Sequence, residues 1–348
     1  MKDKVLYIDF LSPHGHIFFN NIYIRSILKC KYNVIDFVFQ SHYKGKFEFL
    51  STTSKYKYFH SFKNNNKIPH LNAIQYRLYL LMFQLNCMYI AYRGKYTKII
   101  ISSFDNYAIR YFCSKADVYA ICHNNIEMAQ SSQRQSSVLK TVSKKINLIA
   151  LNMESYKYLK SINCNRIHCL PHGYLDRESS CFKNKRIYVP INDFIDKTFC
   201  TKILSDEFDK YLCSIGYKLL VKKNLFSNDY KFKNIEFINR YLSEDEYNSM
   251  LSESDIILLP YDIDRYKYRS SAIFMEAISF NKKIIAPYCE NFKNLKLKGD
   301  FGITLYNDYE NFISLLSDLI NDQSDILYTN VKSENSIDKI SENLQKIL

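Results

Sequence analysis

The segment 268–287 combines two serines, one carboxylate and a long apolar run, in the order YRSSAIFMEAISFNKKIIAP. If a helix starts after the serines, Ser270 and Ser271 lie at its N-terminus. Unpaired backbone N–H groups and the helix dipole there favour an anion such as a diphosphate. Glu276, one to two turns further on, could accept hydrogen bonds from the hydroxyls of a ribose. The same pattern has an ordinary interpretation, since serines cap many helices and helical glutamates usually face water.

Histidines next to strand-like runs are candidate catalytic residues. The segment SPHGH (12–16) follows the first apolar run of the chain. His16 could accept a hydroxyl proton near neutral pH, and Gly15 could let the backbone approach a ligand closely. His123 comes just past the run 117–122. Loop histidines are more often ordinary surface residues, which is the alternative for these positions.

The elements that must position these residues form two series of apolar, strand-like runs separated by helix-like segments. Such alternation predicts parallel α/β units. The first series is 5–11, 33–40, 97–102, 117–122, 147–151 and 166–170, and the second is 186–190, 217–223, 234–238, 255–260, 282–287 and 302–306. The polar segment 171–185 between them suits a linker. We therefore predict two domains, 1–175 and 186–330, and a helix over 331–348 that could pack back on the first domain.

Two segments of the first half have a distinctive composition. Residues 41–69 are rich in Lys, Asn and Ser and predict a long surface loop. Residues 71–92 predict a helix without charge from Leu78 to Tyr92. Arg77 and several amides in this helix argue against a membrane span. It is expected to pack against the protein, and the alternative is a helix that dips into a bilayer surface.

The net charge of +13 is concentrated in the first half of the 348-residue chain. Residues 1–180 carry 25 Lys and Arg against 10 Asp and Glu, whereas the remainder carries 23 against 25. This asymmetry favours an anionic partner, either a membrane surface or a phosphorylated ligand, although a solvated basic face is also possible. No nucleic-acid-binding motif accompanies the charge, so nucleic acid is not expected as a partner.

The cysteine pattern and the N-terminal sequence indicate a reduced compartment. Ten cysteines are scattered without a C-x-x-C pair, and no secretory leader precedes the first apolar run. We expect a cytoplasmic protein, peripheral on the inner membrane face if the basic half contacts lipid.

The run FINRYLSEDEYNSMLSESDIILLPYDIDRYKYRSSAIFMEAISFNKKIIAP (237–287) resembles the nucleotide-sugar domain of GT-B glycosyltransferases, especially glycosyltransferase family four. The matching features are the strand DIILLP, the small residues before the helix, the Glu276–Ala277 pair and the strand KKIIAP. The first half resembles the acceptor domain of the family more weakly. The resemblance implies two Rossmann-like domains whose parallel sheets face each other across a cleft.

The resemblance also implies roles for the donor-side residues. In the family, two glutamates flank seven residues, and Glu276 matches the second, which binds the nucleotide ribose. The first, which contacts the donor sugar, corresponds to Tyr268, so this contact is in doubt here. Ser270 and Ser271 match residues whose backbone approaches the donor diphosphate.

Further positions match the family in the loops after strands. Lys197 and Lys222 (or its neighbour Lys223) correspond to basic residues that offset the diphosphate charge. The loop with Gly15 and His16 resembles the one that carries acceptor or diphosphate contacts, with a histidine as general base in some inverting enzymes. His123 resembles the histidine beside the donor sugar.

These features predict a glycosyltransferase that moves a sugar from a nucleoside diphosphate sugar to a hydroxyl of a glycan or lipid-linked oligosaccharide, in bacterial surface polysaccharide synthesis. No cofactor or metal is expected beyond the donor. The alternatives are a nucleotide-sugar epimerase on the same fold and a non-catalytic glycan- or nucleotide-binding relative, which the missing first glutamate favours. Whether the sugar would be retained or inverted at its anomeric carbon is left open.

Overall fold

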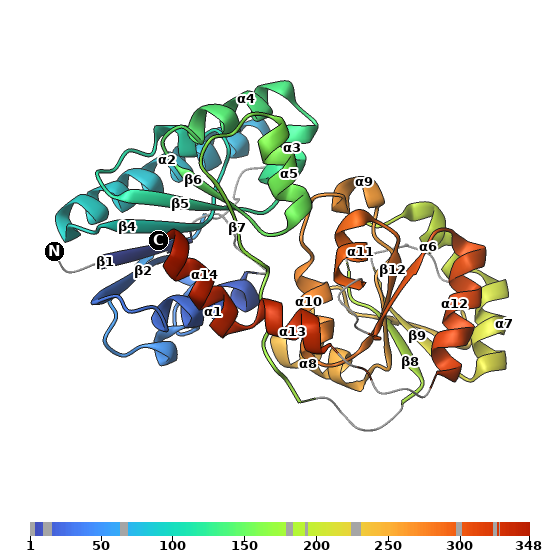
Figure 1. Ribbon diagram of the computed structural model, residues 1–348. Helices are drawn as coiled ribbons and strands as arrows, with labels where there is room; N and C mark the ends of the chain where they lie inside the picture. Colours follow the sequence, from blue (N-terminus) through green and yellow to red (C-terminus); the bar gives the residue numbers. More distant parts are fainter. Residues whose placement is uncertain are drawn as a thin grey trace. The chain divides into compact units, whose positions relative to one another are not determined.

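The computed structural model describes residues 4–9, 16–62, 69–178, 184–191, 194–223, 231–296, 301–322, 326 and 328–348. The chain forms two compact α/β units (Figure 1). The first unit comprises Met1–Gly173, Tyr268–Ser270 and Ile337–Leu348, and the second comprises Tyr174–Lys267 and Ser271–Ser336.

The first unit is built on a parallel sheet with the strand order β3-β2-β1-β4-β5-β6-β7. Its strands are β1 (Lys4–Asp9), β2 (Val34–Gln40), β3 (Tyr56–Phe59), β4 (Lys98–Ser103), β5 (Asp117–Cys122), β6 (Asn147–Ala150) and β7 (Ile167–Cys169). Its helices are α1 (Ile17–Leu28), α2 (Pro69–Gly94), α3 (Asn125–Gln130), α4 (Gln133–Val142), α5 (Met153–Ser161) and α14 (Ile337–Ile347). The direction of strand succession reverses between β1 and β4, the position at which open α/β sheets bind ligands.

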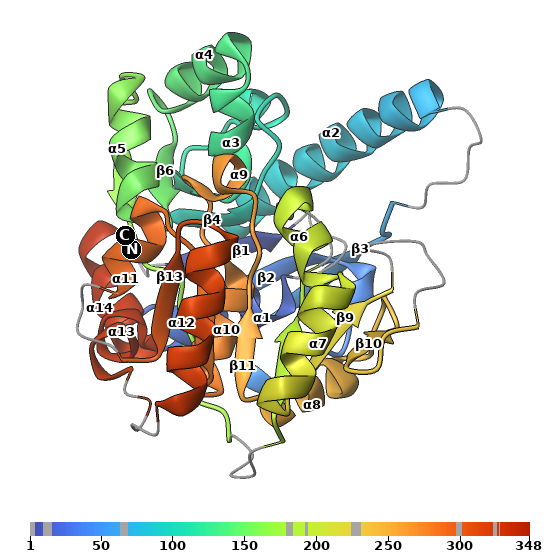
Figure 2. The ribbon, with the colours of Figure 1, turned by 90° about the vertical axis from the view of Figure 1, so that its right-hand side faces the viewer.

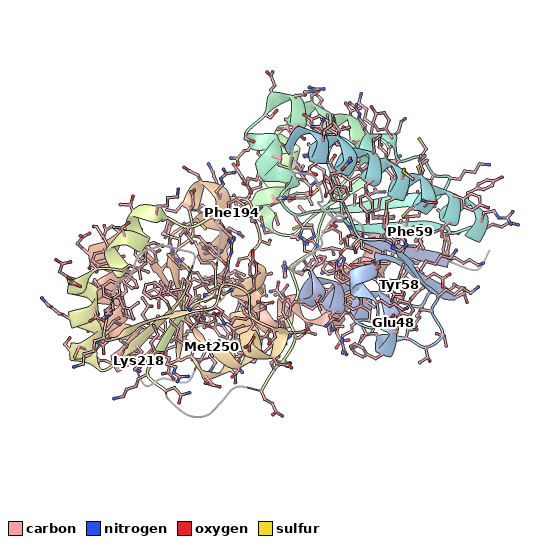
Figure 3. The ribbon with its side chains drawn as sticks, turned by 180° about the vertical axis from the view of Figure 1, so that it is seen from behind. Glu48, Tyr58, Phe59, Phe194, Lys218 and Met250 are labelled. Carbon is pink, nitrogen blue, oxygen red and sulfur yellow. The ribbon has the colours of Figure 1, made fainter. Side chains whose placement is uncertain are left out.

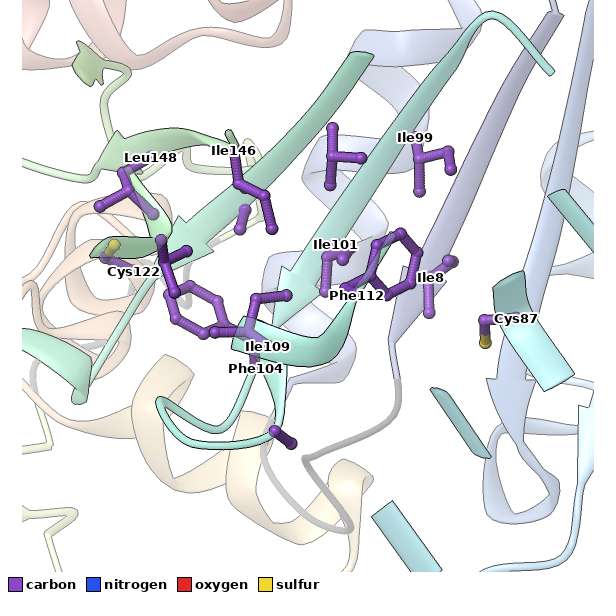
Figure 4. Close-up of a cluster of buried hydrophobic side chains, with 14 of the residues drawn as sticks. Ile8, Cys87, Ile99, Ile101, Phe104, Ile109, Phe112, Cys122, Ile146 and Leu148 are labelled. Carbon is purple, nitrogen blue, oxygen red and sulfur yellow. The ribbon is translucent and has the colours of Figure 1, made fainter. Parts of the chain in front are cut away.

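The central strands β1, β2, β4 and β5 are mostly apolar and buried because both faces of the sheet are covered there. Successive side chains point to opposite faces, so Ile8, Ile99 and Ile101 share one face and contribute to a core cluster with Phe104 and Phe112 (Figure 4). Helices α2 to α5 contribute the other side of this cluster. The prediction of a parallel α/β architecture is confirmed.

The C-terminal helix α14 packs against α1 in the first unit. Lys29 Nζ lies 2.5 Å from Asp338 Oδ1, and Cys30 Sγ lies 3.7 Å from the carbonyl oxygen of Ser341. Leu344 and Ile340 are fully buried on the same helix. The last helix thus completes the cover of the first unit, although α13 (Thr329–Asn335) before it belongs to the second.

The predicted surface loop over 41–69 is wrong in part, because it contains strand β3 at the edge of the sheet. Two short 3-10 turns, Ser41–Tyr43 and Glu48–Leu50, lead into it. The Tyr58 hydroxyl donates a hydrogen bond to Glu48, and the Phe59 ring packs 4.9 Å from that of Phe83 on α2 (Figure 3). Lys57 between the aromatic residues, and Lys55 just before them, made the strand look like a loop, yet an edge strand tolerates such charges.

Helix α2 is longer than predicted and has two different faces. Leu80, Phe83 and Cys87 are buried in the core cluster, which confirms the packed face. The opposite face is exposed, and the N-terminal end of α2 extends beyond the strands of the unit (Figure 2). No helix in the described ranges is long and apolar enough to cross a membrane.

The second unit has a parallel sheet with the order β10-β9-β8-β11-β12-β13. Its strands are β8 (Arg186–Val189), β9 (Lys218–Lys222), β10 (Ile235–Ile238), β11 (Ile256–Leu258), β12 (Lys283–Pro287) and β13 (Ile303–Tyr306). Besides α13, its helices are α6 (Lys197–Ile203), α7 (Asp206–Ile215), α8 (Glu244–Glu253), α9 (Ile263–Tyr266), α10 (Ala272–Ser279), α11 (Glu290–Lys296) and α12 (Tyr309–Asn321). Ser243 and Glu246 form a capping box at the start of α8.

Part of the segment predicted as a linker, 171–185, packs on the second unit. The backbone N–H of Leu175 donates to Ser279 Oγ at 3.3 Å, and that of Arg177 donates to the Ser279 carbonyl at 3.1 Å. Residues 179–183 lie outside the described ranges.

Leu344→Ala should destabilise the first unit by about 2–5 kcal/mol, because it leaves a cavity between α14 and α1. Thermal and urea unfolding followed by circular dichroism would measure the loss. Lys346→Ala, on the exposed face of the same helix, is the matched control and should change stability by less than about 0.5 kcal/mol. Equal effects of the two variants would contradict the packing role of α14.

Candidate functional site

The carboxylate of Glu276 is the centre of a polar cluster in the second unit. It lies on α10 and is only partly exposed. Tyr247 of α8 donates a hydrogen bond of 2.5 Å to Glu276 Oε2. Desolvation raises the pKa of Glu276 to about 7, against the opposing effects of the Tyr247 hydrogen bond and the charges of Arg177 and Lys222. Near neutral pH this carboxylate can therefore exchange a proton or accept a hydroxyl hydrogen bond.

Lys222 is the cation of this cluster. It ends strand β9 and is 6% exposed. Its burial lowers its pKa to about 8, while the charge of Glu276 acts in the opposite direction. Its Nζ lies 5.5 Å from the centre of the Tyr247 ring. Neighbouring Lys223 is exposed, so Lys222 is the lysine placed at the cluster.

Arg177 adds a second positive charge near Glu276. It comes from the segment that joins the two halves of the sequence, and its guanidinium donates to Asn248 Oδ1. The guanidinium also lies 5.2 Å from the centre of the Phe280 ring. On the strand side, the Tyr188 hydroxyl is buried without a hydrogen-bond partner among the described residues. A buried hydroxyl without a partner is available to a ligand.

Ser271 is the N-cap of α10. Its Oγ accepts a hydrogen bond of 3.0 Å from the Phe274 N–H and lies 2.6 Å from the Tyr261 hydroxyl. The predicted helix start after the serines is thus correct. The cap leaves other N–H groups of the first turn aimed out of the helix end, where an anion would find both donors and a favourable dipole.

Tyr268 and Ser270 belong to the first unit instead. The Tyr268 ring packs 5.0 Å from the Tyr158 ring, and its carbonyl accepts a hydrogen bond from Asn152. Asn152 also donates to Ser270 Oγ at 2.8 Å. Tyr268 therefore serves packing within the first unit, which is the physical reason why a tyrosine can stand at this position.

Two further residues were predicted to bind the donor. Lys197 is exposed at the start of α6, directly after the N-cap Asp196. Gly15 lies outside the described residues. The assignments of both to donor binding stay predictions.

In the first unit, the most constrained side chain is that of Asp9, at the end of β1. It is fully buried and accepts hydrogen bonds of 2.6 Å from both Asn20 and Ser103, and a longer one of 3.5 Å from Tyr43. Burial alone would raise the pKa of Asp9, but His16 and the hydrogen bonds outweigh it and lower the pKa to about 2. Asp9 is therefore a permanent negative charge at neutral pH.

His16 precedes α1 and turns its Nδ1 toward this charge. Nδ1 lies 3.7 Å from Asp9 Oδ2, within ion-pair range but too far for a hydrogen bond, and this buried nitrogen has no hydrogen-bond partner among the described residues. The carboxylate favours a proton on Nδ1, which leaves Nε2 with a free lone pair. The His16 and Asp9 side chains thus have the arrangement of a general base and its orienting carboxylate.

His123 lies next to His16, with ring centres 4.5 Å apart. Its Nε2 is 2.8 Å from the Ser102 carbonyl, so that nitrogen carries the proton and donates. Desolvation, together with the charges of His16 and His172, lowers the pKa of His123 well below its usual value. His123 is therefore neutral near pH 7 and suits hydrogen bonding rather than proton storage. Buried His172 completes the group, its ring packed on Phe19.

Metal-binding side chains do not gather in the described part of the chain. No group of three or more His, Cys, Asp or Glu there could hold a metal ion. The D-x-D sequence at 262–264 is used locally, since Asp262 accepts a 3.0 Å hydrogen bond from the Asp264 N–H at the start of α9.

Comparisons of the whole structure identify its fold. HepE from Anabaena, solved in complex with UDP-glucose, aligns with 99% of this chain and 98% of its own, at a TM-score of 0.67 and 11% identity. The lipopolysaccharide outer core galactosyltransferase WaaB aligns with 99% of this chain and 98% of its own, at 0.58 and 11% identity. The chain has the GT-B glycosyltransferase fold.

Another similar structure is a Listeria monocytogenes protein assigned as a UDP-N-acetylglucosamine 2-epimerase, with a TM-score of 0.62 and 9% identity over 99% of this chain and 94% of that one. The sequence itself matches no family model and no curated protein sequence. At these identities the likeness carries the GT-B fold and not the activity.

Four important residues of the two clusters were missed in the sequence. Asp9 follows the apolar residues of the first strand, and an acid at that position was a signal that could have indicated it. Arg177 lies in a polar segment, where a charged residue does not stand out. Tyr247 and Asn20 lie on helices far from their partners in sequence, so no local pattern pointed to them. In this GT-B chain, the partners of Glu276 and His16 depend on tertiary packing.

Asp9→Asn should remove a pH-dependent part of the stability of the first unit. The pKa of Asp9 is lower in the fold than in the unfolded chain, so its contribution is present above about pH 4 and is lost as the pH falls toward 2. The variant should be less stable than the parent by about 2 kcal/mol at pH 7, and this difference should shrink between pH 4 and 2. Urea unfolding at several pH values would measure it.

The matched control is Asp117→Asn, which changes an exposed carboxylate of the same unit. It should leave stability within about 0.5 kcal/mol at every pH. A difference between Asp9→Asn and the parent that does not change from pH 7 to 2 would show that the lowered pKa of Asp9 is not what stabilises the fold.

Proposed function

We propose that the protein is a glycosyltransferase that moves a sugar from a nucleoside diphosphate sugar to an acceptor hydroxyl. The observation that carries the proposal is Glu276 on α10, held by Tyr247 beside the buried Lys222 in the second unit. The same fold binds UDP-glucose in HepE. A glycan or lipid-linked oligosaccharide in surface polysaccharide synthesis is the proposed acceptor.

The donor is bound by the second unit. The Glu276 carboxylate accepts hydrogen bonds from two ribose hydroxyls, and it is ionised above its pKa of about 7, a value to which the charges of Arg177 and Lys222 already contribute. The first turn of α10, capped by Ser271, donates N–H groups to the diphosphate. Lys222 and Arg177 offset the negative charge that develops on the departing diphosphate, so that no metal is needed.

The acceptor is activated by the first unit. His16 Nε2 takes the proton of the acceptor hydroxyl, and the oxygen of that hydroxyl forms a bond to the anomeric carbon of the donor sugar. The bond from that carbon to the diphosphate oxygen breaks, and the diphosphate leaves with the electron pair. Asp9 holds the His16 tautomer and stabilises the imidazolium that forms. A base of this kind favours inversion at the anomeric carbon.

An epimerase is the second candidate, because one similar structure is assigned to that activity. Elimination chemistry needs a group that can both release and accept a proton near neutral pH. Asp9 does not fit, since its pKa is about 2. Glu276 has a suitable pKa but is already engaged by Tyr247. His16 can transfer a proton in either reaction, so these residues do not separate the two activities. The transferase is preferred because the galactosyltransferase WaaB and a glycosyltransferase from Rickettsia africae share the fold over 99% of this chain.

A panel of radiolabelled nucleotide sugars, incubated with the protein and candidate acceptors, tests these alternatives. Transfer of label to an acceptor supports the proposal. Label in an epimerised sugar would show the second candidate to be correct. Binding of the donor without any turnover would identify a non-catalytic relative, for which Tyr268 in place of the family glutamate would be the reason.

Glu276→Gln should weaken UDP-glucose binding by about ten- to a hundredfold at pH 7.5, because an amide accepts ribose hydrogen bonds without charge. In the parent, affinity should rise as the pH passes about 7, where Glu276 ionises, and fall above about 8, where Lys222 loses its proton. Isothermal titration calorimetry across pH 6 to 9 would measure both limbs. UDP-glucose is the suitable probe because its diphosphate has no titrating group in this range.

The rise near pH 7 should be absent in Glu276→Gln and present in Glu310→Gln, a control at an exposed glutamate of the same unit. A parent affinity that is constant from pH 6 to 8 would remove Glu276 from the donor site. Unchanged affinity in Glu276→Gln would do the same.

His16→Ala should lower the turnover number by about 10²- to 10⁴-fold, the usual contribution of a general base. Affinity for UDP-glucose should change by less than about threefold, because the second unit binds the nucleotide. His123→Ala should also reduce turnover more than nucleotide affinity. Equal losses of turnover and affinity in either variant would indicate a structural role, which unfolding curves would reveal.

A further inference from the structure

The first unit contains a pocket of about 290 Å³ that belongs to neither polar cluster. Three arginines line it: Arg77 from α2, Arg110 from the turn after β4, and Arg134 from α4. Leu80 and Leu81 of α2 contribute an apolar wall. The pocket therefore combines positive charge with hydrocarbon, which suits an anionic amphiphile.

The positive charge in this pocket is available to a ligand. No ion pair joins the three guanidinium groups to a carboxylate in the described part of the chain. Arg110 lies over the Tyr111 ring at 4.5 Å, and Arg134 over the Tyr107 ring at 5.3 Å. These rings hold the guanidinium planes without neutralising them.

One carboxylate, Asp105, also lines the pocket. Its Oδ1 accepts hydrogen bonds of 2.9 Å from the backbone N–H groups of both Tyr107 and Ala108. Asp105 therefore shapes the turn that carries Arg110. Three cations against this single acid leave the pocket with an excess of positive charge.

An apolar stripe runs along the exposed face of α2 beside the pocket. Its members follow each other at intervals of three or four residues and fall within an arc of ~80° on an ideal helix. They are Leu71, Ile74, Leu78, Met82, Leu85, Tyr89 and Tyr92, each between 46% and 72% exposed. A contiguous exposed apolar face of this kind marks an interaction surface.

The pocket and the stripe adjoin on α2. Arg77 and Leu81 lie one position away from Leu78 and Met82, on the flank of the stripe that faces the pocket. The sequence of α2 contains no acidic residue from end to end. A partner that touches both features must therefore offer negative charge next to hydrocarbon.

We propose that α2 and this pocket form a membrane-docking site: the three arginines bind the phosphate of an anionic lipid and the stripe enters the acyl-chain region. A lipid bilayer has phosphate groups at its surface and acyl chains directly beneath them, which matches the arginines and the adjoining apolar stripe. Each Lys or Arg near such a surface contributes to binding, and the apolar side chains add to it. The site does not depend on the proposed glycosyl transfer.

A second copy of the chain fits the stripe less well. The stripe has the spacing of a coiled-coil seam, in which charged residues beside the seam pair with opposite charges. Two copies of α2 would bring Arg77 and Arg93 together with arginines and no acid. An anionic lipid surface removes this repulsion.

Sedimentation of the full chain with vesicles tests the proposal. We expect binding to vesicles of phosphatidylcholine with phosphatidylglycerol, weakening with salt, and little binding to phosphatidylcholine alone. The variant Arg77→Gln/Arg110→Gln/Arg134→Gln should bind anionic vesicles about a hundredfold more weakly at low salt. The control Lys31→Gln/Lys44→Gln/Lys57→Gln removes three charges from exposed positions of the same unit and should lose less than about fivefold.

The apolar stripe has its own test. Leu78→Gln/Met82→Gln/Leu85→Gln should remove the binding to anionic vesicles that survives at high salt, a loss of about tenfold or more. Phe49→Gln/Met153→Gln, which changes exposed apolar side chains elsewhere on the unit, should keep it. Unfolding curves establish that each variant is folded, and single substitutions at Arg134 and Met82 replace any that is not.

Four results would overturn the proposal. The first is equal binding to neutral and anionic vesicles. The second is an arginine variant that binds anionic vesicles as tightly as the lysine control does. The third is a dimer that forms without lipid and that the stripe variant abolishes. The fourth is displacement from vesicles by millimolar inorganic phosphate, which would assign the pocket to a soluble anion. A membrane-bound protein without transferase activity would leave the docking site intact and contradict only the proposed function.

Discussion

The first unit depends on the buried charge of Asp9 at the carboxyl end of β1. A carboxylate without exposure to water must be compensated, and Asn20, Ser103 and Tyr43 donate the hydrogen bonds that do so. These donors come from α1, the end of β4 and the turn after β2. The carboxylate of Asp9 thus holds together three segments that follow one another in space. His16 lies beside it, near the position at which the direction of strand succession reverses.

The second unit carries a comparable but weaker constraint. Glu276 and Lys222 are both drawn out of water, which moves their pKa values toward each other, to about 7 and about 8. Burying two such charges does not stabilise a fold by itself. Retaining them at the end of β9 and in the middle of α10, with the Tyr188 hydroxyl unpartnered among the described residues, is consistent with a site whose energetics are completed by a ligand.

Tyr268 stands where the resembled family has a glutamate, and its side chain has a packing role instead. Its ring packs on Tyr158, and Arg269 next to it forms a 3.0 Å ion pair with Glu127. The ion pair is largely shielded from water, where it is worth more than on the surface, and the two tyrosines are half-buried. The segment is thus held within the first unit, while Ser271 directly after it caps a helix of the second.

The sequence alone determined the parallel α/β architecture, the capping box at Ser243, and the helix start at Ser271, because each depends on local periodicity or on residues three positions apart. It also indicated Glu276 and His16 as residues of interest. Only the tertiary structure decided their partners, since Asp9, Tyr247 and Arg177 reach them from other elements. Strand β3 and the exposed stripe of α2 were hidden for the same reason. Whether a lysine-rich strand pairs, or which face of an apolar helix is covered, depends on neighbours that are distant in the chain.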